Sequence, residues 1–147
     1  MSTPAKPVMH QAAPASKARR QSLAGVRLRR HADYQRAYAA SRKRQSASMS
    51  WFLAAQVEPA GPRVGLTVGK VLGPAHQRNC IKRRMREVLR SHLDLLPEGC
   101  DLILHPRRAV LTLEFTKLNA EVVRILSQAK AEAARMTQST ASPKPAV

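Results

Sequence analysis

The chain has 147 residues, of which 26 are Lys or Arg and only 9 are Asp or Glu, so its formal net charge is +17 at pH 7. A charge of this size attracts polyanions, which makes a nucleic acid the expected partner. No run of 18 apolar residues and no apolar signal-peptide core occurs, so we expect a cytoplasmic protein that has no membrane partner.

The length favours a single domain flanked by two tails. Residues 1–22 and 136–147 are rich in Pro, Ala, Ser and Thr and lack a sustained apolar period, so both are predicted to be disordered, the first as a basic tail. Residues 23–135 are left as one predicted RNA-binding domain.

The first element is an amphipathic helix predicted within residues 28–44, "LRRHADYQRAYAASRKR". Steps of three and four residues place Tyr34, Ala37, Tyr38 and Ser41 on one face. Residues 42–44, which are all basic, are predicted to close this helix. They either contact phosphates or complement the negative C-terminal end of the helix dipole.

Two short strands follow, separated by the turn sequence "EPAGP" at 58–62. In the first strand, alternation places Trp51 with Met49 and Leu53 on the probable core face and Phe52 on the opposite face. In the second strand, residues 63–69, the core face holds Val64, Leu66 and Val68.

A basic helix is predicted from the Gly73-Pro74 pair to about His92 or Leu93. Its apolar stripe contains four aliphatic side chains and His92, which we expect to be a packed core residue rather than an acid-base group. The opposite flank is strongly basic, and Glu87 is its only acid. A solvated face normally mixes charges of both signs, so contact with RNA or DNA is the favoured interpretation and plain solvation the alternative. The flank consists of Asn79, Lys82, Arg83, Arg86 and Arg90.

The last two elements are a buried strand, "CDLILH" at 100–105, and a helix from Phe115 to about Arg135. The order helix, strand, strand, helix, strand, helix predicts an α+β fold in which a small mixed sheet packs with helices in an α-β sandwich. Between these elements, Arg107 and Arg108 either contact RNA or are solvated in a loop.

The sequence contains no pattern typical of a protein-based catalytic or metal site. Its acids form no DxD or ExxE-type cluster, and its histidines form no HxH or HExxH arrangement. Cys80 and Cys100 lack CxxC spacing, so neither a zinc site nor a disulfide is expected. We therefore predict no catalytic residue and no metal ligand in the protein itself.

The stretch "RVGLTVGK" followed by "GPAHQRNCIKRRMREVLR" resembles the protein subunit of bacterial ribonuclease P. The family signature Arg-Asn-x-x-Lys-Arg-x-x-Arg stands at residues 78–86, and the resemblance covers roughly residues 26–130. Two departures could reduce RNA affinity. Cys80 occupies a position that is often basic in the family, and Gly69-Lys70-Val71 contains one cation fewer than the usual loop.

The resemblance implies that a large RNA subunit is the catalyst and holds the Mg²⁺ ions, while the protein assists removal of the 5′ leader of precursor tRNA. It also implies an uncommon left-handed crossover around the basic helix. The residues implied to face the catalytic RNA are Lys70, Arg78, Asn79, Lys82, Arg83, Arg86 and Arg90. For the leader cleft, the resemblance points to Tyr34 and Tyr38, and our candidate from the sheet is Phe52.

Two other functions fit the charge. A basic ribosomal protein has a similar size and α+β composition, and a DNA-binding regulator would place the basic helix in a major groove. The signature at residues 78–86 argues against the first. Against the second, a strand precedes the basic helix and no second helix follows at helix-turn-helix spacing, so DNA is not the expected partner. For the three aromatic residues, ordinary packing between helix and sheet remains the alternative.

Overall fold

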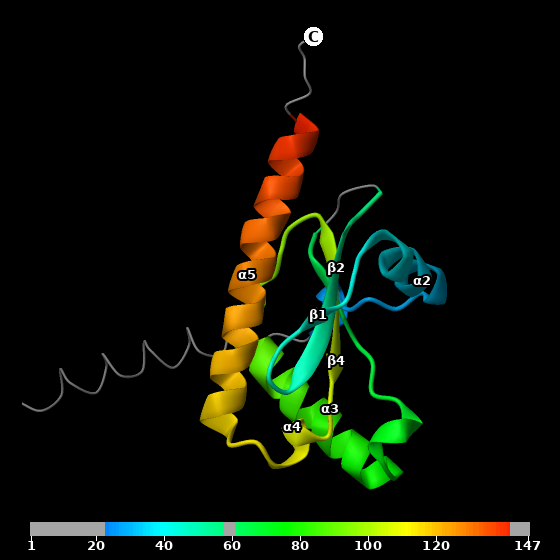
Figure 1. Cartoon of the computed structure of the whole chain (residues 1–147), viewed down its shortest axis with the longest axis vertical. Helices are drawn as coiled ribbons and strands as arrows, with labels where there is room; N and C mark the ends of the chain where they lie inside the picture. The colour runs from blue at the N-terminus through cyan, green and yellow to red at the C-terminus, as the bar shows by residue number, and fades with distance from the viewer. Residues whose placement is uncertain (1–22, 58–60, 142–147) are drawn as a thin grey trace, which may run out of the picture.

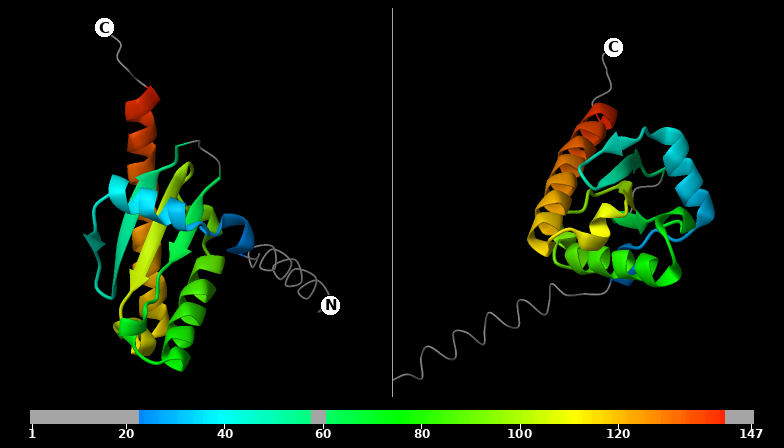
Figure 2. Two further views of the ribbon diagram at one scale, coloured as in Figure 1. Left: turned by 90° about the vertical axis from the view of Figure 1, so that its right-hand side faces the viewer. Right: turned by 60° about the horizontal axis from the view of Figure 1, so that its bottom comes forward.

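The computed structural model describes residues 23–57 and 61–141, which form three layers (Figures 1 and 2). Helix α2 (His31–Ala40) covers one face of a four-stranded sheet, and α3 (Ala75–Arg90) and α5 (Phe115–Ala141) cover the other. The strands are β1 (Arg44–Gln45), β2 (Met49–Ala55), β3 (Arg63–Leu66) and β4 (Cys100–Pro106). The short helices are η1 (Leu23–Val26), η2 (Lys70–Leu72), η3 (Leu93–Leu95) and α4 (Ala109–Thr112).

The strand order in the sheet is β1-β2-β4-β3. The pairs β1–β2 and β2–β4 are antiparallel and β3–β4 is parallel, so the predicted mixed sheet and α+β sandwich are confirmed. Helix α3 lies in the crossover from β3 to β4, and the left-handed sense of this crossover stays an expectation from the resemblance. The two-residue strand β1 was not predicted, because the sequence pattern placed Arg44 at the end of the first helix.

Alternation along β2 assigns its side chains to two separate cores. Met49, Trp51 and Leu53 pack in the main core against α3 and α5, while Ala54 packs in a smaller cluster beneath α2. Phe52 packs against this smaller cluster together with the two tyrosines of α2. The predicted division of these side chains between the two faces of the strand is therefore confirmed, and Phe52 lies on the face of the sheet that α2 covers.

The first helix is shorter than predicted. It ends at Ala40, so residues 42–44 do not close it. Arg44 lies in β1 instead, where its Nη2 is 2.6 Å from Oε1 of Glu132 on α5 and its guanidinium stacks 5.1 Å from the ring centre of Trp51. A partly buried ion pair and a cation–π contact therefore override the local helical pattern at this residue.

Two helix ends also differ from prediction. Helix α3 ends at Arg90, and the half-buried His92 pairs through Nε2 with Oδ1 of Asn119 at 2.8 Å, so it bridges two elements rather than packing in the apolar core. Helix α5 continues to Ala141, into the predicted C-terminal tail, because no helix breaker occurs before Pro143. Residues 1–22 and 142–147 of the predicted tails lie outside the described residues.

A buried carboxylate joins α5 to the turn between β1 and β2. Glu121 is 4% exposed and accepts hydrogen bonds from the main-chain N–H of Ser48 at 2.8 Å and from the hydroxyls of Ser46 and Ser48, both at 2.6 Å. Burial disfavours the charged form, but these three hydrogen bonds outweigh it and lower the pKa of Glu121. The turn is thus held from the far end of the chain.

Candidate nucleic-acid interface

Helix α3 is docked rigidly by its apolar stripe. Ile81, Met85, Val88 and Leu89 are each at most 1% exposed and belong to the main core. Burial of a side chain of this size contributes about 1.5–3 kcal/mol each, so the helix has a fixed rotation about its axis. The stripe was predicted at these four positions, and its burial directs the basic flank outward.

The cations of the outward flank have few acidic partners. Arg90 pairs with Glu87 at 3.6 Å, whereas no ion pair among the described residues involves Lys82, Arg83 or Arg86. Arg83 is exposed, while Lys82, Arg86 and Arg90 are half-buried. Guanidinium groups held apart in this way are suited to binding phosphate oxygens.

The first turns of α3 hold the remaining predicted residues. Asn79 is exposed, and half-buried Arg78 donates from Nε to the carbonyl of Gly73 at 3.0 Å. Gly73 has φ = 129°, a conformation that favours glycine. Exposed Lys70 lies in η2, just before this bend. The structure thus brings all seven residues predicted to face the catalytic RNA onto α3 and its entrance.

Three other arginines are committed to holding loops. Arg84 donates to the carbonyls of Leu111, at 3.3 Å, and Leu113, which joins α3 to the segment before α5. Arg108 donates to the carbonyl of Leu72 at 2.7 Å, and Arg107 to that of Ser46 at 2.6 Å. Arg107 and Arg108 therefore fasten loops, and Arg108 remains exposed, so RNA contact and solvation both stay predictions for this pair.

Beneath α2, aromatic side chains form a half-buried cluster. The ring centres of Tyr38 and Phe52 are 5.0 Å apart in an edge-to-face arrangement, and His105 lies 5.1 Å from Phe52. The Tyr38 hydroxyl is 2.8 Å from Nε2 of His105 and 3.3 Å from Oγ1 of Thr67. We call Tyr38, Phe52 and His105 the aromatic cluster.

Sequence reasoning missed His105. Alternation along strand 100–105 is the signal that would have placed it on the same face as Ile103, but the partner strand was unknown. In the structure His105 pairs in register with Ser50, and Ile103 with Phe52, on antiparallel β2. That pairing brings the imidazole to the aromatic cluster.

Tyr34 is held apart from the cluster, over β3. Its ring centre is 6.4 Å from that of Tyr38, and its hydroxyl donates to the carbonyl of Leu28 at 3.3 Å. Gly65 makes this position possible, because a Cβ at residue 65 would lie 2.5 Å from the Tyr34 hydroxyl oxygen. Burial raises the pKa of Tyr34, so the phenol stays protonated.

Tyr34 lines a cleft of about 860 Å³ that also contains three of the five residues of the basic flank. Lys82, Arg86 and Arg90 form its α3 wall, while Arg27 and Arg29, which sequence reasoning did not single out, come from the segment before α2. A residue predicted for the leader and three residues predicted for the catalytic RNA are therefore brought together. We call this the edge cleft, because it lies along β3 at the edge of the sheet.

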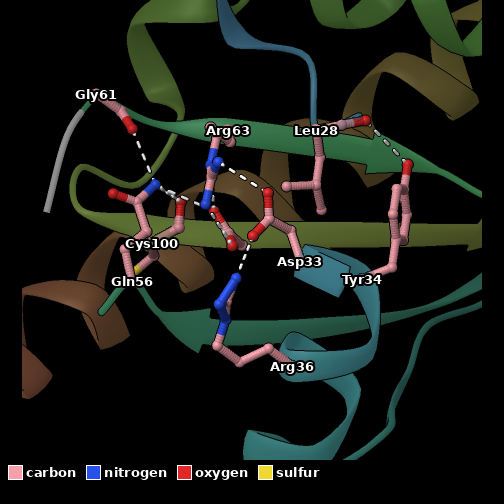
Figure 3. A network of polar contacts seen from close by, with 9 residues as sticks. Leu28, Asp33, Tyr34, Arg36, Gln56, Gly61, Arg63 and Cys100 are labelled. Carbon is pink, nitrogen blue, oxygen red and sulfur yellow. Dashed lines mark hydrogen bonds and ion pairs between the residues drawn. The ribbon is translucent and has the colours of Figure 1, made fainter. Parts of the chain in front are cut away.

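An ion-pair network fixes α2 over the sheet (Figure 3). Arg63 on β3 donates through Nε and Nη2 to both carboxylate oxygens of Asp101 on β4, at 2.9 and 3.1 Å, and through Nη1 to Asp33 on α2 at 3.2 Å. Gln56 donates to Asp101 at 3.1 Å. A hydrogen bond from Arg36, together with the positive charge of Arg63, lowers the pKa of Asp33 despite its burial. Because Asp33 belongs to α2, the network fixes the position of this helix over the sheet and thereby the positions of Tyr34 and Tyr38.

The part of the chain that the structure describes contains no group of three or more His, Cys, Asp or Glu side chains placed to hold a metal ion. The carboxylates of Asp33 and Asp101 share Arg63 as an ion-pair partner. These residues do not fit a resident metal site. Within the same residues, no helix combines the length and apolar character needed to cross a membrane.

A three-layer α+β domain with a basic helix docked on one face and a half-buried aromatic cluster on the other defines a class, that of RNA-binding proteins. The family model described as Ribonuclease P matches residues 24–130. The chain belongs to the ribonuclease P protein family, which places it in tRNA processing.

Known relatives and solved structures are similar over most of the domain. The ribonuclease P protein component of Chloroflexus aggregans is 38% identical over 107 residues, 70% of this chain and 76% of the relative. That of Thermobifida fusca is 31% identical over 103 residues, 65% and 70% of the two chains. The Staphylococcus aureus RNase P protein has a TM-score of 0.62 at 27% identity, covering 71% of this chain and 95% of that one. The Thermotoga maritima protein, at 23% identity and a TM-score of 0.61, shares the fold.

Proposed function

We propose that this chain is the protein component of a ribonuclease P holoenzyme that removes the 5′ leader of precursor tRNA. In this proposal the protein binds both the catalytic RNA subunit and the leader, and the RNA subunit carries out the endonucleolytic cleavage. Mg²⁺ would be held mainly by that RNA, since the described residues offer no metal cluster.

The observation that carries the proposal is the state of the cations on α3. Lys82, Arg83 and Arg86 have no acidic partner among the described residues. They lie on a helix whose opposite face is packed in the main core. Each cation that neutralises a phosphate releases a condensed counterion, which is a large source of affinity for RNA. This flank and Lys70 are therefore proposed to bind the catalytic RNA.

The aromatic cluster supports binding of the single-stranded leader. Tyr38, Phe52 and His105 are half-buried, so each is anchored by packing and still offers ring surface. Unpaired bases stack on such rings with about 1–3 kcal/mol per base, largely independently of sequence. A leader of variable sequence suits this kind of surface.

The experiment that tests the proposed function is cleavage of a precursor tRNA at low Mg²⁺ by bacterial ribonuclease P RNA, with and without this protein. We expect stimulation that requires the RNA, and no cleavage by the protein alone. Tight RNA binding without stimulation would instead favour a ribosomal or general RNA-binding role.

A further inference from the structure

The loop that leads into α3 is held by two arginines. This entrance loop, residues 69–74, contains η2 and the bend at Gly73. Arg108, which precedes α4, donates from Nη1 to the carbonyl of Leu72 at 2.7 Å, and Arg78 donates from Nε to the carbonyl of Gly73 at 3.0 Å. Two consecutive carbonyls of the loop are therefore bound by guanidinium groups.

Arg108 also binds the first turn of α3. Its Nη1 is 2.8 Å from Oε1 of Gln77, so one nitrogen bridges the entrance loop and the helix. Gly73 makes this bridge possible, because a Cβ at residue 73 would lie 2.6 Å from Nη1 of Arg108 and 2.7 Å from Oε1 of Gln77. The glycine thus leaves the space that the bridge occupies.

The main chain at Arg108 is fixed by the body of the domain. Val110, two residues further on, is 0% exposed and belongs to the main core. The N–H of Arg107 donates to the carbonyl of Ser48 at 2.9 Å, which ties the preceding residue to the turn between β1 and β2. The guanidinium of Arg108 therefore connects the entrance loop to a rigid support.

Lys70 is the cation that this support holds in place. It is exposed, it forms no ion pair among the described residues, and it is the only Lys or Arg between Arg63 and Arg78 in the sequence. Its carbonyl accepts a hydrogen bond from the N–H of Gly73 at 3.1 Å, so its backbone belongs to the turn that Arg108 holds. A lysine on a fixed backbone loses less conformational entropy on binding a phosphate than a lysine on a loose loop.

We propose that Arg108 is a positioning residue for RNA binding. From the start of α4 it holds the entrance loop, and Lys70 on that loop contacts a phosphate of ribonuclease P RNA. This inference rests on the proposed function and extends it, since an arginine outside α3 acts through Lys70. The alternative is a direct contact between Arg108 and the RNA, and the test separates the two.

The test measures binding of the full chain to bacterial ribonuclease P RNA over a range of salt concentrations. Arg108→Lys keeps the positive charge on a shorter side chain, which does not reproduce the 2.7 and 2.8 Å contacts unless the loop moves. It is compared with Lys70→Ala and with the double variant Lys70→Ala/Arg108→Lys. Two exposed cations of α5 supply the controls, Arg124→Lys for the change from Arg to Lys and Lys117→Ala/Arg124→Ala for loss of charge.

We expect Arg108→Lys to weaken binding about fivefold in roughly 0.15 M salt and to lower the slope of log affinity against log salt by about 0.7–0.9, the value for one phosphate. Lys70→Ala should have the same effect. The double variant should lose no more than either single variant, because both changes remove the same contact. Gln77→Met, which deletes one acceptor of Arg108 without changing the charge, should cause a smaller loss. Both controls should keep the parent slope.

Three outcomes would overturn the inference. If Arg108→Lys bound the RNA as Arg124→Lys does, the bridge would not be needed for binding. If the losses added, to a slope change of about 1.4–1.8 in the double variant, Arg108 would act independently of Lys70. If Arg108→Lys lowered only the free energy of unfolding in urea and left the slope unchanged, Arg108 would have a folding role alone.

The proposed function is tested separately, by stimulation of precursor cleavage by the parent protein. Any of the three outcomes, obtained with a parent protein that stimulates cleavage, would refute the inference and leave the proposed function standing. Failure of the parent protein to stimulate would refute both.

Discussion

The hydroxyl oxygen of Tyr38 on α2 lies 2.8 Å from Nε2 of His105 on β4. This hydrogen bond crosses from the helix layer to the sheet and locks the orientation of both rings. A platform whose side chains are already ordered loses less conformational entropy when a ligand binds. The bond therefore links the stability of the aromatic cluster to its proposed use as a binding surface.

Replacing Tyr38 tests that use directly. Tyr38→Ala should weaken holoenzyme binding of precursor tRNA by about 1–3 kcal/mol, the value of one stacked base, and leave mature tRNA binding unchanged. Tyr38→Phe keeps the ring and should lose much less. If Tyr38→Ala weakened both tRNAs equally, the residue would have a folding role only.

His105 should make stability depend on pH. Burial, with a smaller effect from the charge of Lys43, lowers the pKa of His105 from its usual 6.5. Between the two pKa values the unfolded chain then binds more protons than the folded one. The free energy of unfolding is therefore greatest above about pH 6.5 and decreases as the pH falls toward the lower pKa. Urea unfolding from pH 7.5 to 5 should show this decrease.

The control for the pH dependence is His105→Gln, which can still form a hydrogen bond but does not titrate. It should remove this part of the pH dependence. Asp33 and Glu121 also have lowered pKa values, but their usual values, 3.8 and 4.5, lie below this pH range. A decrease that persists in His105→Gln would rule out the imidazole as its source.

The basic flank of α3 predicts a specific salt dependence. Arg83→Ala/Arg86→Ala should lower the log–log salt slope of binding to ribonuclease P RNA by roughly 1.4–1.8, taking 0.7–0.9 per phosphate. The Lys117→Ala/Arg124→Ala protein carries the same net charge and should retain the parent slope. An unchanged slope in the α3 variant would remove those arginines from the interface.

The ion-pair network predicts a loss of stability. Arg63→Met leaves the carboxylates of Asp33 and Asp101, each 5% exposed, without their shared cation. Breaking a fully buried pair costs 3–5 kcal/mol, and because the Arg63 side chain is 34% exposed we expect about 2–3 kcal/mol in urea unfolding. Arg36→Ala, which removes a more exposed partner of Asp33, should cost less than about 1 kcal/mol. Equal costs would show that Arg63 is not the central residue of the network.

Local pattern was sufficient for the parts of the fold that depend on period alone. The apolar stripe of α3 and the opposite facing of Trp51 and Phe52 follow from periods of 3.6 and 2, and both are confirmed. What could not be predicted depends on long-range partners. Arg44 leaves the first helix because Glu132, 88 residues away, binds it, and Arg84 turns inward because the carbonyls before α5 accept its hydrogen bonds.

The candidate site likewise has parts that follow from local pattern and parts that depend on long-range contacts. The basic flank could be predicted because one helix carries it. The edge cleft could not, because it needs residues from α3, β3 and the segment before α2 to meet, and Arg27 reaches it only through the bridge to Val64. His105 likewise joins the aromatic cluster through strand pairing with β2.

The bonds from Ser46 and Ser48 to Glu121 have a consequence for how the protein is made. They span 75 and 73 residues, so the turn that begins the sheet is secured by a side chain near the other end of the domain. During synthesis the ribosome must release residue 121 before the hairpin of β1 and β2 gains this anchor. We therefore expect the domain to complete its folding late in synthesis, with its basic surfaces reaching their final arrangement only when α5 has emerged.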